Sequence, residues 1–190
     1  MNEIEVWIGE LQTATPVGTL CLAVTRRGLW RVKMTDDPRV FFDDLAARCG
    51  VSLRVPASTP DPLPARRLEQ AFAQLSEFLG GHREVFDLEL DFAGVPAFQY
   101  SALLAAQKIG FGQMCTYQDL ARQLERPGAA RAVGAAMSAN PLPLIIPCHR
   151  VVGSDRKLHG FAAPGGVRTK AWLLALEGIP VTQGKKEIHV

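Results

Sequence analysis

The feature that most constrains the fold of this chain is a change in its sequence pattern near Asp91. Three short β-rich runs with turn signals between them open the chain, which predicts an antiparallel meander. These runs are residues 4–11, 19–25 and 29–34. After Asp91 the apolar residues recur at helical spacing and glycines separate the segments. The change predicts an α+β protein with a small α/β domain over residues 1–90 and a mainly helical domain over residues 91–190.

Two amphipathic helices and one more strand are expected in the first half. The first helix begins at Asp37-Pro38 and ends at Gly50, and a proline-rich loop follows over residues 56–64. The second helix follows this loop and ends at Gly80-Gly81. Apolar and acidic residues alternate over residues 86–90, which predicts a strand. The apolar faces of the helices consist of Phe41, Phe42, Leu45 and Ala46, and of Leu68, Phe72, Leu75 and Leu79.

Composition excludes several classes of protein. A chain of 190 residues with 47% hydrophobic content is ordinary for a globular protein, and without a run of about 18 apolar residues we expect no membrane-spanning helix. The acidic start of the chain lacks the basic segment and apolar stretch of a signal peptide, so we expect a cytoplasmic protein. No two cysteines form a Cys-x-x-Cys pair, which argues against a disulfide scaffold and an ordinary zinc site. The cysteines are Cys21, Cys49, Cys115 and Cys148.

Charge is distributed unevenly along the chain. Residues 1–90 contain 10 Lys and Arg against 13 Asp and Glu, whereas residues 91–190 contain 11 against 6. A surplus of positive charge of this size is common in proteins, so it does not by itself indicate a function. A basic C-terminal half nevertheless suits an anionic partner, and nucleic acid is one such partner.

The C-terminal half contains a predicted helix-turn-helix. A helix over residues 96–109 stops at a Gly-Phe-Gly break, and Thr116 can then cap a helix that runs to Leu124, with Asp119 as its capping-box partner. A turn and a second helix over residues 129–139 follow. This is the plan of a DNA-binding helix-turn-helix, although other helical hairpins share it.

The second of these helices has almost no side-chain bulk. Arg131 projects alone among alanines and glycines. Small residues permit close packing against a neighbouring helix, and they also permit close approach to DNA with Arg131 reaching into the duplex. Because base-reading side chains are missing, such a helix would bind DNA with little sequence preference.

The tetrapeptide Pro147-Cys148-His149-Arg150 ends the apolar run of residues 142–146. Most lone buried cysteines are inert. A cysteine beside a histidine and an arginine can carry a stabilised thiolate, which is the reactive form of sulfur. Pro147 also limits the backbone freedom before the cysteine. Cys148 is therefore a candidate nucleophile.

These residues resemble the O6-alkylguanine-DNA alkyltransferases, also called methylated-DNA–protein-cysteine methyltransferases. The resemblance runs through Tyr117, residues 131–134, Asn140-Pro141, residues 146–152, Gly160-Phe161, Gly165-Gly166, Lys170 and residues 173–178. Residues 16–20 are similar to the first hairpin of the family. The resemblance implies an RNase H-like antiparallel sheet in the N-terminal domain and a winged-helix-like helix-turn-helix in the C-terminal domain.

The resemblance implies DNA repair by direct reversal. The family transfers the alkyl group of O6-alkylguanine in double-stranded DNA irreversibly to a cysteine, so that each molecule acts once; O4-alkylthymine is a second candidate substrate. Cys148 would be the nucleophile, His149 would take its proton through a water, and Glu177 would orient the histidine. Tyr117 would donate a proton to the leaving guanine. Asn140 would tie the recognition segment to the active-site turn.

Minor-groove binding and base flipping are implied as well. Arg131 would fill the stack that the flipped nucleotide leaves, and the small residues around it would permit entry into the groove. Phe161 stands where many members have a tyrosine, so it can stack on the base but offers no hydroxyl. The implied DNA contacts are Thr116, Tyr117, Ala129, Ala130, Arg131 and Gly134. The implied base pocket consists of Tyr117, Met137, Val151, Phe161 and Ala162.

Some members of the family bind structural zinc, but Cys21, Cys49 and His82 form no convincing set of zinc ligands, so we predict no metal. We also predict no cofactor, and we expect a monomer. Three other functions compete with repair. A non-catalytic alkyltransferase-like protein that binds lesions would lack Cys148. A Cys-His-Glu hydrolase would need an oxyanion hole and would leave Arg131 unexplained. A transcription regulator would need base-reading side chains.

Overall fold

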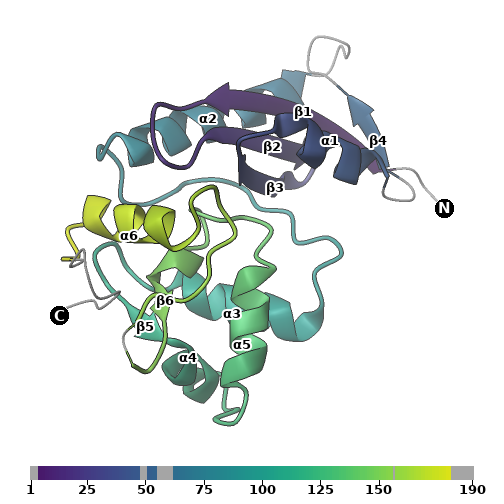
Figure 1. Cartoon of the computed structure of the whole chain (residues 1–190). Helices are drawn as coiled ribbons and strands as arrows, with labels where there is room; N and C mark the ends of the chain where they lie inside the picture. The colour runs from purple at the N-terminus through teal and green to yellow at the C-terminus, as the bar shows by residue number, and fades with distance from the viewer. Residues whose placement is uncertain (1–3, 48–50, 55–61, 156, 181–190) are drawn as a thin grey trace. The chain divides into compact units, whose positions relative to one another are not determined.

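The chain divides into two compact units, Met1–Ala93 and Gly94–Val190 (Figure 1). The computed structural model describes residues 4–47, 51–54, 62–155 and 157–180. The described residues of the first unit form a four-stranded sheet with two helices, and those of the second unit are mainly helical. No helix of these residues is both long and apolar enough to cross a membrane. The protein therefore combines α and β structure, as the change of pattern predicts.

The sheet of the first unit has the strand order β3-β2-β1-β4. Its strands are β1 (Ile4–Gln12), β2 (Thr19–Thr25), β3 (Gly28–Thr35) and β4 (Val51–Arg54). Strands β1 to β3 form the predicted antiparallel meander. The expectation of a wholly antiparallel sheet is wrong, because β4 pairs with β1 in parallel. With only four residues, β4 gives too short an alternation to be seen in the sequence.

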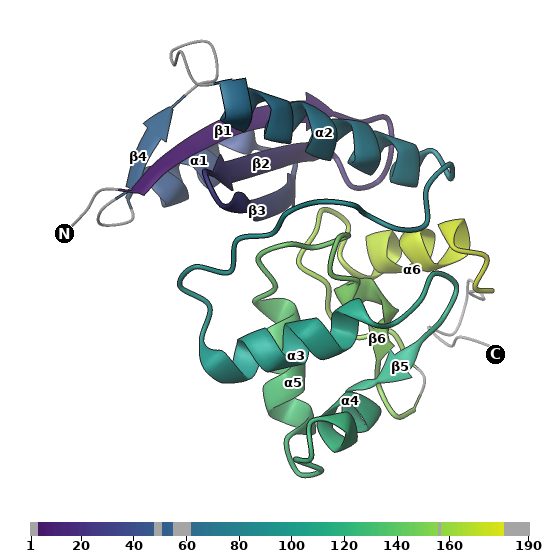
Figure 2. The same ribbon diagram turned by 180° about the vertical axis from the view of Figure 1, so that it is seen from behind.

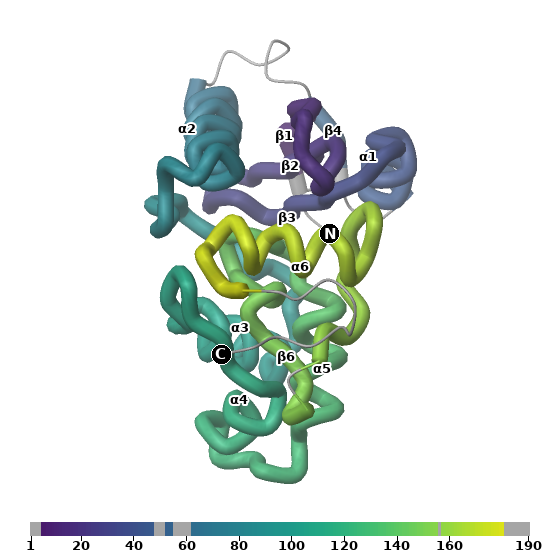
Figure 3. Tube along the Cα trace, turned by 60° about the vertical axis from the view of Figure 1, so that its left-hand side comes forward, coloured from purple at the N-terminus to yellow at the C-terminus, as the bar shows by residue number. Residues whose placement is uncertain are grey.

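One helix covers each face of this sheet, α1 (Pro38–Ala46) on one side and α2 (Pro62–Leu79) on the other (Figure 3). Successive residues of a strand point to opposite faces, so both faces can be apolar. A Cβ on Gly9 would lie 3.0 Å from the Phe72 ring, so this glycine lets α2 approach β1 closely. The core on the α1 side consists of Val6, Cys21, Ala23, Trp30, Phe41 and Leu45.

The ends of these helices follow from their caps. Asp37 accepts a hydrogen bond from the Arg39 backbone N–H at 3.1 Å, which confirms the predicted start of α1. The predicted stop at Gly50 lies outside the described residues. The loop predicted over residues 56–64 extends too far, because α2 begins at Pro62. Prolines are tolerated in a first helical turn. Residues 56–61 of that loop lie outside the described residues.

The strand predicted over residues 86–90 does not form. Only an isolated bridge between Leu29 and Leu90 is present in the described part of this segment. The side chain of Gln74 replaces a neighbouring strand, since its amide donates to the Asp87 carbonyl at 2.9 Å and accepts from the Asp87 N–H at 2.8 Å. The alternation of apolar and acidic residues therefore marked a segment that Gln74 holds at Asp87 and that the Leu29 backbone holds at Glu89 and Asp91, not a regular strand.

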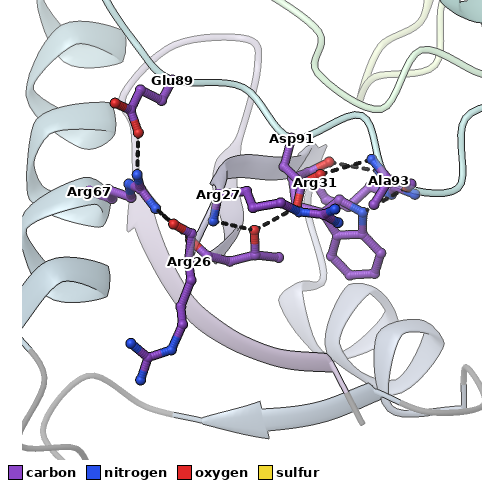
Figure 4. Close-up of polar contacts among 9 residues, drawn as sticks. Arg26, Arg27, Arg31, Arg67, Glu89, Asp91 and Ala93 are labelled. Carbon is purple, nitrogen blue, oxygen red and sulfur yellow. Dashed lines mark hydrogen bonds and ion pairs between the residues drawn. The ribbon is translucent and has the colours of Figure 1, made fainter. Parts of the chain in front are cut away.

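A buried carboxylate fixes the end of the first unit (Figure 4). Asp91 accepts hydrogen bonds from the Thr25 hydroxyl at 2.6 Å, from Arg27 Nε at 3.2 Å and from the Ala93 N–H at 2.9 Å. Arg67 reaches the same region and binds Glu89. These contacts attach the segment after α2 to the turn between β2 and β3, so the unit extends through Ala93.

Three helices of the second unit pack against one another, namely α3 (Ala97–Gln107), α4 (Tyr117–Gln123) and α5 (Ala130–Ser138) (Figure 2). Each agrees with a predicted helix to within two residues. Strands β5 (Cys115–Thr116) and β6 (Val151–Val152) form a parallel pair. The 3-10 helix η2 (Cys148–Arg150) precedes β6, and α6 (Val167–Leu176) follows it.

The helix-turn-helix of α4 and α5 is built as the sequence predicts. Thr116 accepts a hydrogen bond from the Asp119 N–H at 3.0 Å, and Asp119 accepts one from the Thr116 N–H at 3.3 Å, which confirms the capping box. Val133, Ala136 and Met137 are the buried side of α5. The opposite side of α5, which includes Arg131, is exposed.

Candidate active site

The parallel pairing of β5 with β6 brings distant segments of the second unit together. Tyr117 follows β5 directly, and the segment Cys148–Arg150 directly precedes β6. Helix α6 packs against η2, and Glu177 is its C-cap residue. The apolar run of residues 142–146 is buried throughout, and Cys148 is only 6% exposed. The Cys148 side chain is therefore almost completely shielded from solvent.

Asn140 holds the loop that leads to the cysteine. Its amide donates to the Ile146 carbonyl at 2.9 Å, and its side-chain oxygen accepts from the Leu142 N–H at 3.0 Å. This side chain thus closes residues 140–146 into a fixed loop, and it also acts to lower the pKa of the Cys148 thiol.

A buried network of three charged or ionisable side chains lies behind Cys148. His149 Nε2 and Glu177 Oε1 are 2.6 Å apart. Arg150 binds the same carboxylate with both arms of its guanidinium, Nε to Oε2 at 2.8 Å and Nη2 to Oε1 at 3.0 Å. Its Nη1 donates to the Ile109 carbonyl at 2.6 Å. Because Glu177 is held from two sides, it fixes the orientation of the His149 ring.

Burial and charge set the protonation of this network. Burial alone would raise the pKa of Glu177, but the hydrogen bonds from His149 and Arg150 outweigh it and hold that pKa below its ordinary value. Burial lowers the pKa of His149, against the opposing effect of Glu177. The imidazole is therefore neutral at physiological pH, as a proton acceptor must be.

The surroundings of Cys148 differ from the sequence expectation in one respect. Arg150 was expected to stabilise a thiolate, but its guanidinium is bound to Glu177. Burial raises the pKa of the Cys148 thiol, while the Asn140 side chain and the positive charge of Lys170 act against that rise. The resting sulfur is a thiol, so it needs a base before it can attack.

Tyr117 lies between the sulfur and the second helix of the helix-turn-helix. Burial and the nearby Cys148 raise the pKa of its phenol, so the hydroxyl keeps its proton. A Cβ placed on Gly134 would lie 3.9 Å from the Tyr117 ring. The lack of a side chain at Gly134 therefore keeps the face of this ring open.

A cavity of about 810 Å³ opens beside Tyr117 and α5. Helix α5 provides one wall, with the exposed Arg131 on it, and the loop after β6 provides another. The residues around the cavity are Tyr117, Gln118, Ala130, Arg131, Gly134, Ser138, Gly153, Ser154, Asp155, His159, Gly160, Phe161 and Ala162. Small residues predominate on the α5 wall, whereas the loop wall also carries Asp155, His159 and Phe161.

The structure brings most of the expected DNA and base contacts to this cavity, but not all. Met137 and Val151 are buried and are not among its lining residues. Ala129 is the N-cap of α5 and is not among the lining residues, whereas the next residue, Ala130, is. The Thr116 hydroxyl is engaged by Asp119 at 2.6 Å, so its first role is in the helix cap.

Two residues near Glu177 and Val151 had no role assigned to them in the sequence analysis. Gly112 donates its N–H to Glu177 at 3.3 Å, and Lys170 donates to the Val151 carbonyl at 2.6 Å. The sequence does contain a sign that Lys170 is unusual. It lies at helical spacing from Leu173 and Leu174, on the buried face of α6, where an apolar residue is expected. Gly112 has no such signal.

The prediction of no metal depends on three possible ligands, Cys21, Cys49 and His82. Among the described residues no group of three or more His, Cys, Asp and Glu could hold an ion. Cys49 lies outside them. Burial, and then the charge of Glu10, raise the pKa of Cys21 to about 11, so this sulfur is a thiol and a poor ligand. His82 is exposed in a turn.

Comparisons with known proteins agree on one family. The family model described as "6-O-methylguanine DNA methyltransferase, DNA binding domain" matches residues 97–179. A rat methylated-DNA–protein-cysteine methyltransferase is 35% identical over 176 residues, which cover 89% of this chain and 81% of that protein. The Salmonella typhimurium protein of the same name is 48% identical over 106 residues, 55% of this chain. The match spans only 60% of the Salmonella protein's length.

Solved structures show the same likeness over nearly the whole chain. The crystal structure of Mycobacterium tuberculosis OGT in complex with DNA has a TM-score of 0.69 at 31% identity and covers 92% of each chain. The Mycobacterium tuberculosis O6-methylguanine methyltransferase has a TM-score of 0.68 at 32% identity, with 90% of this chain and 92% of that one covered.

Proposed function

Because the chain belongs to the methylated-DNA–protein-cysteine methyltransferase family, we propose that it repairs DNA by moving the alkyl group of O6-alkylguanine onto Cys148. The observation that carries this proposal is the convergence of Cys148, His149, Glu177 and Tyr117, of which Tyr117 lines a cavity that Arg131 also borders. A nucleophile, a neutral base, a carboxylate that orients the base and a protonated phenol are the groups that alkyl transfer requires.

The transfer proceeds in steps that these residues divide among them. The Cys148 proton passes through a water to His149, whose positive form Glu177 stabilises. The sulfur then forms a bond to the alkyl carbon, and the bond from that carbon to guanine O6 breaks. Its electron pair goes to the guanine, which takes a proton from Tyr117 on a ring nitrogen. The resulting thioether does not hydrolyse, so each molecule acts once.

Helix α5 is the part of the protein that enters the minor groove. The alkyl carbon lies inside the double helix, and flipping the nucleotide costs a few kcal/mol, less for a damaged base that pairs poorly. Arg131 fills the vacated stack, and the cavity holds the extruded base against Phe161 and Tyr117. A structural neighbour from Mycobacterium tuberculosis that binds DNA supports this docking.

The finer features of the fold belong to the same proposal. We assign an RNase H-like topology to the sheet of the first unit and a winged-helix-like form to the helix-turn-helix, with DNA binding and alkyl transfer in the second unit. The strand order β3-β2-β1-β4 with a parallel β1–β4 pair supports the first assignment. We place the protein in the cytoplasm as a monomer. The non-catalytic alternative is not favoured, since Cys148 is present and the relatives carry the name of an enzyme.

Counting product tests the proposal. Duplex DNA with O6-methylguanine is mixed in excess with the protein, and repaired guanine is measured against protein. We expect one repaired base for each molecule at most, and none with Cys148→Ala, which should still bind the duplex. A second turnover would support the hydrolase reading, and full activity of Cys148→Ala would remove the proposed acceptor.

A further inference from the structure

The loop that carries Phe161 is attached to helix α6 by a buried hydroxyl. Thr169 lies in the first turn of α6 and is 1% exposed. Its hydroxyl donates a hydrogen bond to the Pro164 carbonyl. A buried donor that loses its acceptor bears the full cost of its desolvation, so such a contact is retained more firmly than one at the surface. This hydrogen bond therefore fixes the end of the loop against α6.

The backbone of the loop closes around this contact. The Gly166 N–H donates to the Ala163 carbonyl at 2.9 Å. Gly165 has a φ of +72°, and a Cβ placed on it would lie 2.9 Å from the Thr169 hydroxyl oxygen. A glycine at this position therefore permits both the backbone conformation and the close approach of the hydroxyl. Residues 163–166 thus form a closed turn that Thr169 holds from the helix.

This turn lies next to Phe161, which lines the cavity. A Cβ placed on Gly166 would lie 3.9 Å from the Phe161 carbonyl oxygen, so the start of α6 is close to the backbone of Phe161. Ala162 alone separates Phe161 from the turn in the sequence, and it also lines the cavity. The turn, and through it Thr169, therefore sets the position of this part of the cavity wall.

The other end of the same wall is held less firmly. His159 Nε2 lies 3.2 Å from Asp155 Oδ1, and both of these side chains are half-exposed. Exposed pairs of this kind contribute little, because water screens them and competes for their hydrogen bonds. The buried Thr169 contact is therefore the attachment that determines where Phe161 lies.

We propose that Thr169 is a positioning residue for the repair reaction, and that its hydroxyl holds Phe161 where the ring can stack on the extruded base. This inference rests on the alkyl transfer proposed above. Thr169 is not among the residues that line the cavity, so it acts on the base through the loop. No bond forms or breaks at Thr169. Its effect is on the capture of the base and not on the attack by Cys148.

Four variants of the full chain test this role. Thr169→Val removes the hydroxyl and keeps the volume of the side chain, whereas Thr169→Ser keeps the hydroxyl. Gly165→Ala disturbs the same contact from the loop, without a change in α6. Thr25→Val is the matched control, because the buried Thr25 hydroxyl donates to Asp91 at 2.6 Å in the first unit.

The assay is single-turnover methyl transfer from free O6-methylguanine over a range of base concentrations, since the free base needs the cavity but not the insertion of α5 into a duplex. Thr169→Val and Gly165→Ala should raise the half-saturating concentration about fivefold or more, as loss of a base–aromatic stack does, and keep the limiting rate within about twofold of wild type. Thr169→Ser and Thr25→Val should match wild type in both constants.

A combination with Phe161→Ala tests whether Thr169 acts through this ring. Phe161→Ala alone should raise the half-saturating concentration of the base. Addition of Thr169→Val should then raise it little further, because residues that act through one contact are not additive. Hydrogen exchange of residues 161–166 should be faster in Thr169→Val than in wild type, whereas that of α3 and α4 should not change.

Two results would overturn the inference while wild type still transfers the methyl group. In one, Thr169→Val captures the base as well as wild type does; if this variant does not fold, the same result with Gly165→Ala decides. In the other, the effects of Thr169→Val and Phe161→Ala multiply in the double variant, which would mean that Thr169 acts by a route that bypasses Phe161. Absence of transfer by wild type would instead refute the proposed function itself.

Discussion

Arg150 should carry much of the stability of the second unit, although it does not line the cavity. Replacement by methionine keeps the length of the side chain and removes the guanidinium. Glu177 then loses hydrogen bonds of 2.8 and 3.0 Å, and the Ile109 carbonyl loses one of 2.6 Å. The carboxylate stays buried, because His149 and α6 still enclose it.

The expected loss can be worked out from these contacts. Removal of one partner of a buried ion pair typically costs about 3–5 kcal/mol, against a total of about 5–15 kcal/mol for a domain. The folded-state pKa of Glu177 lies below its ordinary value, so its pairing contributes stability above the unfolded pKa and loses it as the pH falls. The difference between Arg150→Met and wild type should therefore shrink as the pH falls below about 4.

Hydrogen exchange during urea unfolding measures this loss in each unit separately. The second unit should be destabilised in Arg150→Met and the first should not change. Arg122→Met is the control, because its pair with Asp119 at 3.1 Å is exposed and should contribute less than about 1 kcal/mol. A loss in Arg150→Met no larger than in this control, or one that stays constant with pH, would refute the reasoning.

Three further variants test the other groups of the site. Arg131→Ala should slow transfer from duplex DNA by about tenfold or more and leave transfer from the free base nearly unchanged, because flipping costs a few kcal/mol only in the duplex. Tyr117→Phe should keep DNA affinity and slow the chemical step by about 10²–10⁴-fold, as loss of a general acid does; an equal loss of affinity would contradict the assignment. Asn140→Ala should destabilise the second unit by about 1–3 kcal/mol in urea and raise the thiol pKa, since two backbone groups lose a partner and the Cys148 thiol loses a side chain that lowers its pKa.

Local signals in the sequence predicted the elements that local interactions determine. The capping box at Thr116, the proline after Asp37 and the helical spacing of α2 each act within a few residues, and each was read correctly. The strand expected over residues 86–90 is reduced to a single bridge with Leu29, because the Gln74 side chain, which is distant in the sequence, satisfies the Asp87 backbone instead. Such a contact leaves no trace in a periodicity.

The site shows the same division. Because Arg150 is close to Cys148 in the sequence, we expected it to stabilise the thiolate. Successive residues of η2 point in different directions, however, and Arg150 binds Glu177. The pairing of β5 with β6 that brings Tyr117 to the sulfur involves only two residues on each strand, too few for a pattern. Lys170 was visible as a charge in an apolar stripe, but only the fold reveals which groups it faces.

The central claim is that Cys148 receives the alkyl group and keeps it. The direct measurement is the mass of the cysteine peptides after the protein has met duplex DNA with O6-methylguanine. We expect the peptide with Cys148 to be heavier by one methyl group, and those with Cys21, Cys49 and Cys115 to be unchanged. Repaired DNA with no mass change at Cys148, or with the methyl group on another cysteine, would contradict the account.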